Sequence, residues 1–459
     1  MVQSKHSIPK DLMVNGSHKP LFRFVADNIR DFLAENDVHV QRDAKTSEAT
    51  MQVKCLELGF TFSFTYENES LSRGTMIQWD KGWDIPDALG RDPCEMLQTA
   101  IDDLDLPVHV SALVSDSVGT LMARSYTSKG KPNTLMGAIF GTGTNAAYVE
   151  RLSNVTKLQT RPDFLDHQPE SIIIINTEWG AFDEDMTVLP TTIYDDLLDK
   201  DSANRKSQML EKRISGLYLG ELLRLVMCSL MDAKLLDMTV DADSLLTKPY
   251  TMDSSFLTSL AQDESRSLDV SMGFVSDALR ARNLTYKDTR AIQSIAVAIA
   301  RRASRLAGAA IGAIIVQSGK LHPPNISSPS TSSSDAPKTT DTKEKVSDPA
   351  RLSGLSKAWY FLDRHLCQLL SRLGQSLKTH STPVSVLEPA IGHSNSDEVT
   401  VDIGVDGSLF EFYPTFEEGI RGALRDIPEI GPGGERRITM GLARDGSGVG
   451  AALVAQSIS

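Results

Sequence analysis

Apolar and polar residues recur along this chain with two different periods, and segments of the two kinds alternate. In segment 21–36, "LFRFVADNIRDFLAEN", the apolar residues are spaced as on one face of a helix, which is typical of an amphipathic helix. In segment 107–117, "PVHVSALVSDS", most positions are apolar, which is typical of a parallel strand that is covered on both faces. An alternation of strands and helices favours a layered α/β fold.

The same criteria predict the remaining elements. Further strands are expected within 51–66, 135–150 and 170–182, and a helix within 92–105. Segment 205–235 predicts one long helix or two, and 289–317 predicts a long helix whose small residues allow close packing on a sheet. Towards the C-terminus we expect a hairpin at 398–414 and a strand, a glycine loop and a helix within 436–457.

The composition changes abruptly at residue 318. Segment 318–349 is rich in Ser, Thr, Pro, Lys and Asp and contains few large apolar residues, so it predicts a disordered linker. An amphipathic helix is expected next, at 355–377. This helix either docks on the body of the protein or, tethered by the linker, binds a protein partner.

The overall composition indicates a globular protein without a nucleic-acid or membrane surface. Hydrophobic residues make up 41% of the 459 positions and charged residues 23%, which is ordinary for soluble proteins, and the length allows two or three domains. The net charge is −13, so the basic surface that nucleic acid or an anionic membrane requires is missing. Neither is therefore expected as a partner, whereas an anionic small ligand is not excluded.

The cysteines and the N-terminal residues do not indicate export. Four cysteines (Cys55, Cys94, Cys228 and Cys367) are scattered without metal-binding spacing, so no metal site is expected and a reducing compartment is indicated. The sequence begins without an apolar leader, and the most apolar stretch, 306–317, is too short to span a bilayer. We therefore expect a cytoplasmic protein, with access to the nucleus left open.

Three glycine-rich segments follow predicted strands: "FGTGTN" (140–145), "GVDGSL" (404–409) and "RDGSGVGAAL" (444–453). Glycine allows backbone N–H groups to approach a phosphate, and a helix N-terminus adds a favourable dipole. Each loop alone is a weak signal, but together they favour nucleotide binding. The pattern GxxxxGK[ST] is absent, so a Walker-type site is excluded.

Polar side chains stand where several predicted strands end. Asp116, Asn145 and Glu178 each follow an apolar strand, and Glu211 is expected on a helix. Open α/β sheets bind ligands at the carboxyl ends of their strands, and converging carboxylates and amides suit a polyhydroxylated ligand. An aspartate beside a hydroxyl can also take its proton. Glu211 could equally be a solvated ion-pair residue, whereas a buried unpaired carboxylate at Asp116 or Glu178 would be costly.

In order and spacing, the motifs of this chain resemble those of the hexokinase family. The resemblance covers nearly the whole chain except 318–385 and rests on the segments "LGFTFSF", "GTMIQWDKGW", "SALVSDSVGTL", "GAIFGTGTNAAYVE", "INTEWGAF", "LEKRISGLYLGELLRL", "GVDGSLFEFYPTF" and "DGSGVGAALV". It implies the actin-like, ribonuclease-H-like α/β fold, with two lobes that close on a sugar and ATP carrying Mg²⁺. The implied activity is ATP-dependent phosphorylation of a hexose 6-hydroxyl. The implied organisation is a small lobe at 1–128, a large lobe at 129–317 and 386–459, and an insertion at 318–385.

The resemblance also implies roles for individual residues. Asp116 matches the general base that deprotonates the sugar hydroxyl, and Lys81 matches a lysine that reaches the reacting oxygen. The positions matched to sugar binding are Ser63, Asp80, Ser115, Asn145, Glu178 and Glu211. The positions matched to the nucleotide are Gly141, Thr142, Gly143, Gly407, Ser408, Gly446, Ser447 and Gly448.

The sequence departs from the family pattern at several points. In the family a phosphate-binding hairpin of the type LDLGGTN precedes "HSIPKDLM", which here begins at residue 6, so the small lobe is expected to be incomplete unless the native chain starts earlier. Ser115 stands where the family has asparagine, and Asp80 where it has threonine. Because phosphoryl transfer depends on positioning and electrostatic stabilisation, these departures predict impaired activity. The two hypotheses are a hexose kinase of reduced activity and a sugar-responsive regulator without catalysis.

Overall fold

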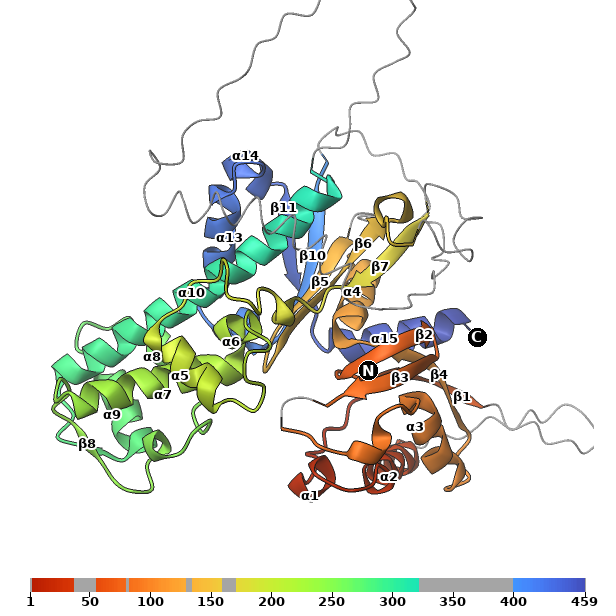
Figure 1. Cartoon of the computed structure of the whole chain (residues 1–459), viewed down its shortest axis with the longest axis horizontal. Helices are drawn as coiled ribbons and strands as arrows, with labels where there is room; N and C mark the ends of the chain where they lie inside the picture. The colour runs from red at the N-terminus through yellow and green to blue at the C-terminus, as the bar shows by residue number, and fades with distance from the viewer. Residues whose placement is uncertain are drawn as a thin grey trace, which may run out of the picture.

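The computed structural model describes residues 2–36, 55–79, 82–128, 134–158, 171–321 and 399–458. Its elements form two bodies, with helices α4 (Asp116–Thr127) and α15 (Gly446–Ile458) between them (Figure 1). Strands and helices alternate along the chain, so the predicted α/β class is confirmed.

The smaller body combines strands with helices that cover them. Its elements are α1 (Lys10–Met13), α2 (Lys19–Glu35), β1 (Leu56–Thr61), β2 (Thr65–Ser70), β3 (Arg73–Gln78), α3 (Pro93–Asp102) and β4 (Val108–Val114). Strands β1 and β4 pair in parallel, and β2 and β3 form an antiparallel hairpin. The helices predicted within 21–36 and 92–105 are α2 and α3, whose apolar faces pack together and bury Phe22, Leu97 and Ile101.

The larger body is built on a mixed sheet of order β11-β10-β5-β6-β7. Its strands are β5 (Thr134–Phe140), β6 (Thr144–Arg151), β7 (Ile172–Asn176), β10 (Val401–Asp406) and β11 (Ile438–Leu442). Strands β5, β10 and β11 are parallel, whereas β6 and β7 run antiparallel to their neighbours. The carboxyl ends of the three parallel strands therefore meet at one edge of the sheet.

Helices surround this sheet and extend away from it (Figure 1). They are α5 (Ile193–Asp201), α6 (Glu211–Ile214), α7 (Gly216–Asp232), α8 (Ser254–Ala261), α9 (Asp269–Leu279), α10 (Tyr286–Ser318), α12 (Ser408–Phe412), α13 (Phe416–Asp426) and α14 (Gly431–Glu435). A short pair of strands, β8 (Thr239–Val240) and β9 (Ala281–Arg282), joins the loops at their far end. The long helix predicted at 289–317 is α10, but the close packing that was predicted on a sheet is made on helix α13 instead, where Gly308 meets the backbone of Ile420.

Helices α4 and α15 pack against each other. Helix α4 also packs against the sheet of the larger body, and α15 packs against strands β1 and β4 of the smaller body. A Cβ atom on Gly450 would lie 1.9 Å from the carbonyl oxygen of Gly119, so the two helices touch backbone to backbone. At the next residue of α15, a Cβ atom on Gly59 of strand β1 would lie 2.1 Å from the carbonyl oxygen of Ala451. Glycine is required at these contacts because a side chain has no room there.

Two predicted elements differ in the structure. The hairpin predicted at 398–414 is wrong, because β10 is followed by helix α12. Both edges of β10 are already paired, with β5 and β11, so no edge is left for a hairpin partner. The strand predicted over 135–150 is two antiparallel strands, β5 and β6, which turn at the glycine loop. Of the alternatives for 205–235, the structure has two helices, α6 and α7.

Several predictions lie outside the described residues. They include the linker and the helix predicted at 355–377, and both Asp80 and Lys81. Within the described part of the chain, no helix has the combination of length and apolar character that crossing a bilayer requires.

Candidate active site

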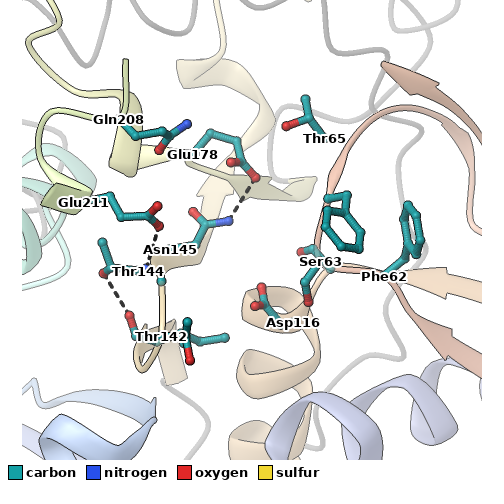
Figure 2. A pocket seen from close by; sticks show the side chains of 14 residues that line it. Phe62, Ser63, Thr65, Asp116, Thr142, Thr144, Asn145, Glu178, Gln208 and Glu211 are labelled. Atoms are coloured by element: carbon teal, nitrogen blue, oxygen red, sulfur yellow. Dashed lines mark hydrogen bonds between the residues drawn. The ribbon is translucent and has the colours of Figure 1, made fainter. Parts of the chain in front are cut away.

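A cavity of about 270 Å³ lies beside the β1–β2 connection of the smaller body. On its other side are the last residues of β5, the first residues of β6, the turn after β7 and the start of α6. Figure 2 shows that its side chains come from both bodies and from the helix between them. The residues that line it are Phe62, Ser63, Phe64, Thr65, Ser115, Asp116, Ile139, Thr142, Gly143, Thr144, Asn145, Glu178, Gln208 and Glu211. The lining is mostly polar, which suits a ligand with several hydroxyl groups.

Asp116 is the first residue of helix α4, directly after buried strand β4. Ser115 is the N-cap of this helix, and its hydroxyl accepts a hydrogen bond from the N–H of Val118 at 3.4 Å. One carboxylate oxygen of Asp116 accepts from the N–H of Ser117 at 2.7 Å. The partial positive charge of the helix N-terminus attracts the carboxylate at this position. The carboxylate faces the cavity (Figure 2).

A group of amides and a carboxylate forms the wall opposite Asp116. Asn145 Nδ2 donates to Glu178 Oε1 at 2.9 Å, and Asn176 Nδ2 donates to the same oxygen at 2.7 Å. Asn176 Oδ1 accepts from the hydroxyl of Ser117 at 3.1 Å, which connects this wall to helix α4. The backbone of Glu178 has φ of 49°, a left-handed conformation that costs roughly 1–3 kcal/mol in a non-glycine residue. Such strain persists where the surrounding contacts fix the residue, as they do here.

Glu211, the first residue of helix α6, connects the cavity to the glycine loop between β5 and β6. Its Oε2 atom accepts from the backbone N–H of Thr144 at 3.0 Å. At the start of α7, the N–H of Gly216 donates to the carbonyl of Gly141 at 2.8 Å, so the same helical region also holds the loop. Gly180, next to the Glu178 turn, accepts from the N–H of Leu210 at 3.1 Å. The segments that carry Glu178 and Glu211 are therefore in direct contact.

The pKa of Tyr66 in strand β2 is affected by the carboxylates of this site. Burial raises the pKa of its phenol, and the nearby carboxylates of Glu178 and Asp116 raise it further. The phenol therefore stays protonated at neutral pH, beside two carboxylates that come from other elements.

Three glycine loops stand at the carboxyl ends of the parallel strands β5, β10 and β11. Gly407 has φ of 111°, and a Cβ atom there would lie 2.4 Å from the carbonyl carbon of Phe140, so only glycine fits. The N–H of Gly407 donates to Asp406 Oδ1 at 2.7 Å. Burial raises the pKa of Asp406, although hydrogen bonds from the N–H groups of Gly407 and Gly446 oppose the rise. This carboxylate thus ties two of the three loops together.

The third loop also contacts the smaller body. The hydroxyl of Thr61, at the end of β1, donates to the carbonyl oxygen of Ser447 at 3.0 Å. Gly446 and Ser447 open helix α15, whose N-terminus is a favourable position for an anion. Within the described residues, no group of three or more His, Cys, Asp or Glu side chains is arranged to hold a metal ion.

The residues predicted from the sequence fall into three sets. One set lines the cavity: Ser63, Ser115, Asp116, Thr142, Gly143, Asn145, Glu178 and Glu211. A second set lies in or beside the glycine loops next to it: Gly141, Gly407, Ser408, Gly446, Ser447 and Gly448. Asp80 and Lys81 lie outside the described residues, so their predicted roles are not tested.

Sequence reasoning missed further residues of the cavity wall. They are Phe62, Phe64, Thr65, Ile139, Thr144 and Gln208, and Asn176 stands directly behind Glu178. Most of them lie within two positions of a predicted residue in the chain, and this closeness in sequence was the only indication that they line the cavity. Gln208 lies before helix α6 in a turn with φ of 56°, so no local spacing indicates its place in the cavity wall.

Comparisons with known proteins agree with this geometry. A family model described as hexokinase matches residues 135–457, and another hexokinase model matches residues 1–126. The chain is 39% identical to glucokinase from Aspergillus niger over 99% of its own length and 80% of that protein. It is 31% identical to hexokinase-1 from Saccharomyces cerevisiae over 99% of its own length and 74% of that protein. Among solved structures, hexokinase from Schistosoma mansoni complexed with glucose is 28% identical, with a TM-score of 0.68 over 98% of this chain and 78% of that chain.

Proposed function

The chain belongs to the hexokinase family, and on that premise we propose that it transfers the terminal phosphoryl group of ATP to the 6-hydroxyl of a hexose. The observation that carries the proposal is the cavity that Asp116 shares with Asn145, Glu178 and Glu211. Glucose is the first hexose to test, because relatives of this chain are named glucokinases and a solved relative is complexed with glucose.

In this proposal the polar wall holds the sugar ring. Glu178 and Glu211 each present a carboxylate that accepts hydrogen bonds from sugar hydroxyls. Their protein partners, Asn145 and the N–H of Thr144, keep these carboxylates in place before the ligand arrives. Hydrogen bonds to ionised groups contribute roughly 1.5–3 kcal/mol each, so this wall accounts for most of the affinity and orientation.

Asp116 is the proposed general base. One of its oxygens is held by the N–H of Ser117, and its carboxylate faces the cavity. The carboxylate takes the proton of the 6-hydroxyl as that oxygen attacks the terminal phosphorus of ATP and the bond from this phosphorus to the leaving ADP breaks. A positioned base of this kind contributes roughly 10²–10⁴ to the rate.

The three glycine loops are the proposed nucleotide site. Gly407 packs directly against the backbone of Phe140 and Gly141, which holds the loop after β10 beside the loop after β5. The N–H groups of Gly141, Gly407 and Gly446 already donate within the protein. The N–H groups that would hold the polyphosphate are those of Thr142, Gly143, Ser408, Ser447 and Gly448. ATP would supply the phosphoryl group, and the Mg²⁺ ion bound to it would neutralise charge on its oxygens. Lys81 is proposed to reach the reacting oxygen.

The test is a coupled assay of glucose phosphorylation by the full chain with MgATP. We expect turnover, within or below the range of about 1–100 s⁻¹ that is typical of kinases. Asp116→Asn is the matched control: it should lower kcat by roughly 10²–10⁴ and leave calorimetric glucose binding within a few-fold of wild type. Glucose binding by wild type without any turnover would contradict the proposal and support the regulator hypothesis.

The regulator hypothesis is not favoured by the observations above. A protein that only sensed sugar would need Glu178 and Glu211, but it would not need a carboxylate at the start of α4 facing the same cavity as the glycine loop. Reduced activity, which Ser115 and Asp80 predict, stays a prediction that the same assay measures.

A further inference from the structure

Two buried cations stand next to Glu211 and have no part in the proposed chemistry. Lys212 and Arg213 follow Glu211 in helix α6, and they are only 2% and 1% exposed. A buried cation is costly unless hydrogen bonds or opposite charges compensate it. The hydrogen-bond partners of Lys212 and Arg213 therefore show which segments these side chains hold in place.

Lys212 joins helix α6 to helix α5. Its Nζ atom lies 2.7 Å from Asp199 Oδ1 and also donates to the carbonyl of Asn204. The same carboxylate accepts from the backbone N–H of Lys206 at 2.8 Å. Lys212 and Asp199 together thus fix both ends of the segment 204–206, which leads into the sugar site.

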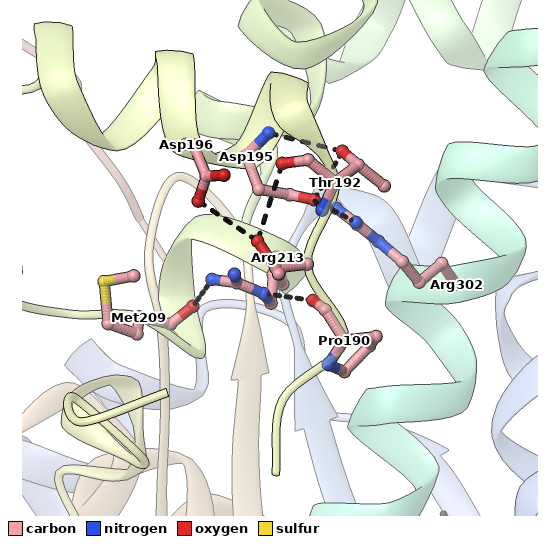
Figure 3. A network of polar contacts seen from close by, with 8 residues as sticks. Pro190, Thr192, Asp195, Asp196, Met209, Arg213 and Arg302 are labelled. Carbon is pink, nitrogen blue, oxygen red and sulfur yellow. Dashed lines mark hydrogen bonds and ion pairs between the residues drawn. The ribbon is translucent and has the colours of Figure 1, made fainter. Parts of the chain in front are cut away.

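Arg213 joins two other segments to helix α6 (Figure 3). Its Nε atom donates to the carbonyl of Pro190, and its Nη1 atom donates to the carbonyl of Met209, both at 2.8 Å. Within the described part of the chain, Arg213 makes no ion pair of its own. Burial lowers its pKa, and the nearby charge of Asp195 opposes that shift.

The carboxylate that compensates Arg213 is itself anchored. Both oxygens of Asp195 accept from the guanidinium of Arg302 in helix α10 at 2.8 Å, and Asp195 also forms the capping box of α5 with Thr192 (Figure 3). Asp195 and Arg302 therefore tie α5 to α10 beside Arg213, and helix α6 packs against both of these helices.

The backbone that these contacts enclose is strained. Lys206 and Gln208 have φ of 62° and 56°, in the left-handed region that non-glycine residues rarely adopt. Glu184 holds this turn from the other side, where its Oε1 accepts from the hydroxyl of Ser207 at 2.7 Å and from the N–H of Gln208 at 3.1 Å. Met209, whose carbonyl Arg213 holds, connects this strained turn to helix α6.

We propose that Arg213, supported by Lys212, is a positioning residue of the sugar site: it keeps Gln208 and Glu211 at the cavity by fixing the strained turn before α6. The inference rests on the proposed function and goes beyond it, because neither cation touches the cavity. Glu211 also holds the N–H of Thr144, so a shift of α6 reaches the glycine loop as well.

The test compares Arg213→Met with Arg213→Lys. Methionine keeps much of the side-chain volume but leaves the carbonyls of Pro190 and Met209 without donors, whereas lysine restores one donor and the charge. We expect Arg213→Met to raise the KM and the calorimetric Kd for glucose about tenfold or more. Arg213→Lys should recover part of this loss. If Arg213→Met does not fold, Arg213→Lys alone is expected to raise the glucose KM about threefold.

Arg421→Met is the matched control, since Arg421 of helix α13 also holds a carbonyl, that of Ile438, in addition to Glu417 and Glu435. It should lower the thermal unfolding temperature and leave the glucose KM unchanged. A folded Arg213→Met protein with the wild-type glucose KM would overturn the inference, because a purely structural role changes stability and not sugar affinity. Wild-type protein that binds no glucose would overturn the proposed function instead.

Discussion

Ser115 has two tasks that the sequence does not separate. Its hydroxyl caps helix α4, and the residue also lines the cavity beside Asp116. Asparagine caps a helix about as well as serine and adds an amide that can bind a sugar hydroxyl. We therefore expect Ser115→Asn to lower the glucose KM several-fold, which corresponds to about 1 kcal/mol for one added hydrogen bond. Steady-state kinetics at saturating ATP measure this change.

Ser115→Ala tests the capping role of Ser115 separately from the contact with the sugar. It removes the cap, so it should cost about 1 kcal/mol in the free energy of unfolding without lowering the glucose KM. If Ser115→Asn and Ser115→Ala have the same glucose KM, the amide makes no contact with the sugar, and the predicted cause of reduced activity at this position is wrong.

Asp263 gives a pH-dependent contribution to stability. Its oxygens accept from the hydroxyl of Ser265 at 2.6 Å and from the N–H of Ser271 at 2.8 Å, and these hydrogen bonds lower its pKa to about 2. Since an unfolded aspartate titrates near 3.9, the stabilisation is complete above about pH 4 and is lost as the pH falls towards 2.

We therefore expect wild type to be more stable than Asp263→Asn at pH 7, and the difference to shrink as the pH is lowered from 4 towards 2. Urea unfolding of both proteins at several pH values measures it. Other carboxylates whose pKa the fold lowers, such as Asp183, titrate in both proteins and cancel in the comparison. A difference that does not change with pH would contradict this assignment.

The sequence made visible those polar residues that follow or interrupt an apolar run: Asp116 and Glu178 follow strands β4 and β7, whereas Asn145 lies at the start of strand β6. Asp116, Asn145 and Glu178 interrupt apolar runs, so their polarity stood out against the pattern. Asn176 and Gln208 could not be found in this way, because Asn176 completes a strand of isoleucines and Gln208 lies in an irregular turn. Their place depends on tertiary contacts, which no local period encodes.

At the scale of elements, helices α4 and α15 bring the proposed base and a nucleotide loop together. Asp116 opens α4, Gly446 and Ser447 open α15, and the two helices cross where Gly450 meets Gly119. A methyl group on Gly450 would lie 1.9 Å from a backbone oxygen, so the helices have to separate. Overpacking of this kind costs about 1–3 kcal/mol.

We therefore expect Gly450→Ala to lower kcat more than it changes the glucose KM, and to lower the temperature of thermal unfolding. The control is Gly273→Ala in helix α9, where a Cβ atom would meet nothing within 4 Å. That variant should be at least as stable as wild type, since alanine favours a helix, and should leave the kinetics unchanged. Equal effects of the two substitutions would contradict a specific role of the helix crossing.

The elements also show where periodicity stops being informative. Helices α2, α3 and α10 followed from the spacing of apolar residues, because each buries one face along its length. The structure of segment 398–414 did not follow from its pattern. Two apolar runs around a glycine predict a hairpin, but the pattern does not show whether the first strand has a free edge for a hairpin partner. The pairing of β10 with β5 and β11 decides the outcome, and both partners are distant in sequence.

At the scale of the whole molecule, the site depends on residues that no single body contains. Ser63 comes from the smaller body, Glu178 and Glu211 from the larger one, and Asp116 from the helix between them. That these residues share one cavity was predicted only from the resemblance of the ordered motifs to those of a family. Periodicity alone predicts strands and helices but not which strand ends face each other.

A ligand in this cavity should therefore stabilise the whole chain by bridging both bodies. A ligand that binds only the folded state at one hundred times its Kd adds about 2.7 kcal/mol to the free energy of unfolding. We expect D-glucose to raise the temperature of thermal unfolding progressively with concentration, and L-glucose at the same concentrations to leave it unchanged, because its hydroxyls cannot reach Asn145, Glu178 and Glu211 in one orientation. Glu178→Gln should weaken the response, since it removes an ionised acceptor that Asn145 and Asn176 hold in place. Equal shifts with both sugars would indicate a solvent effect of concentrated sugar and not occupancy of the cavity.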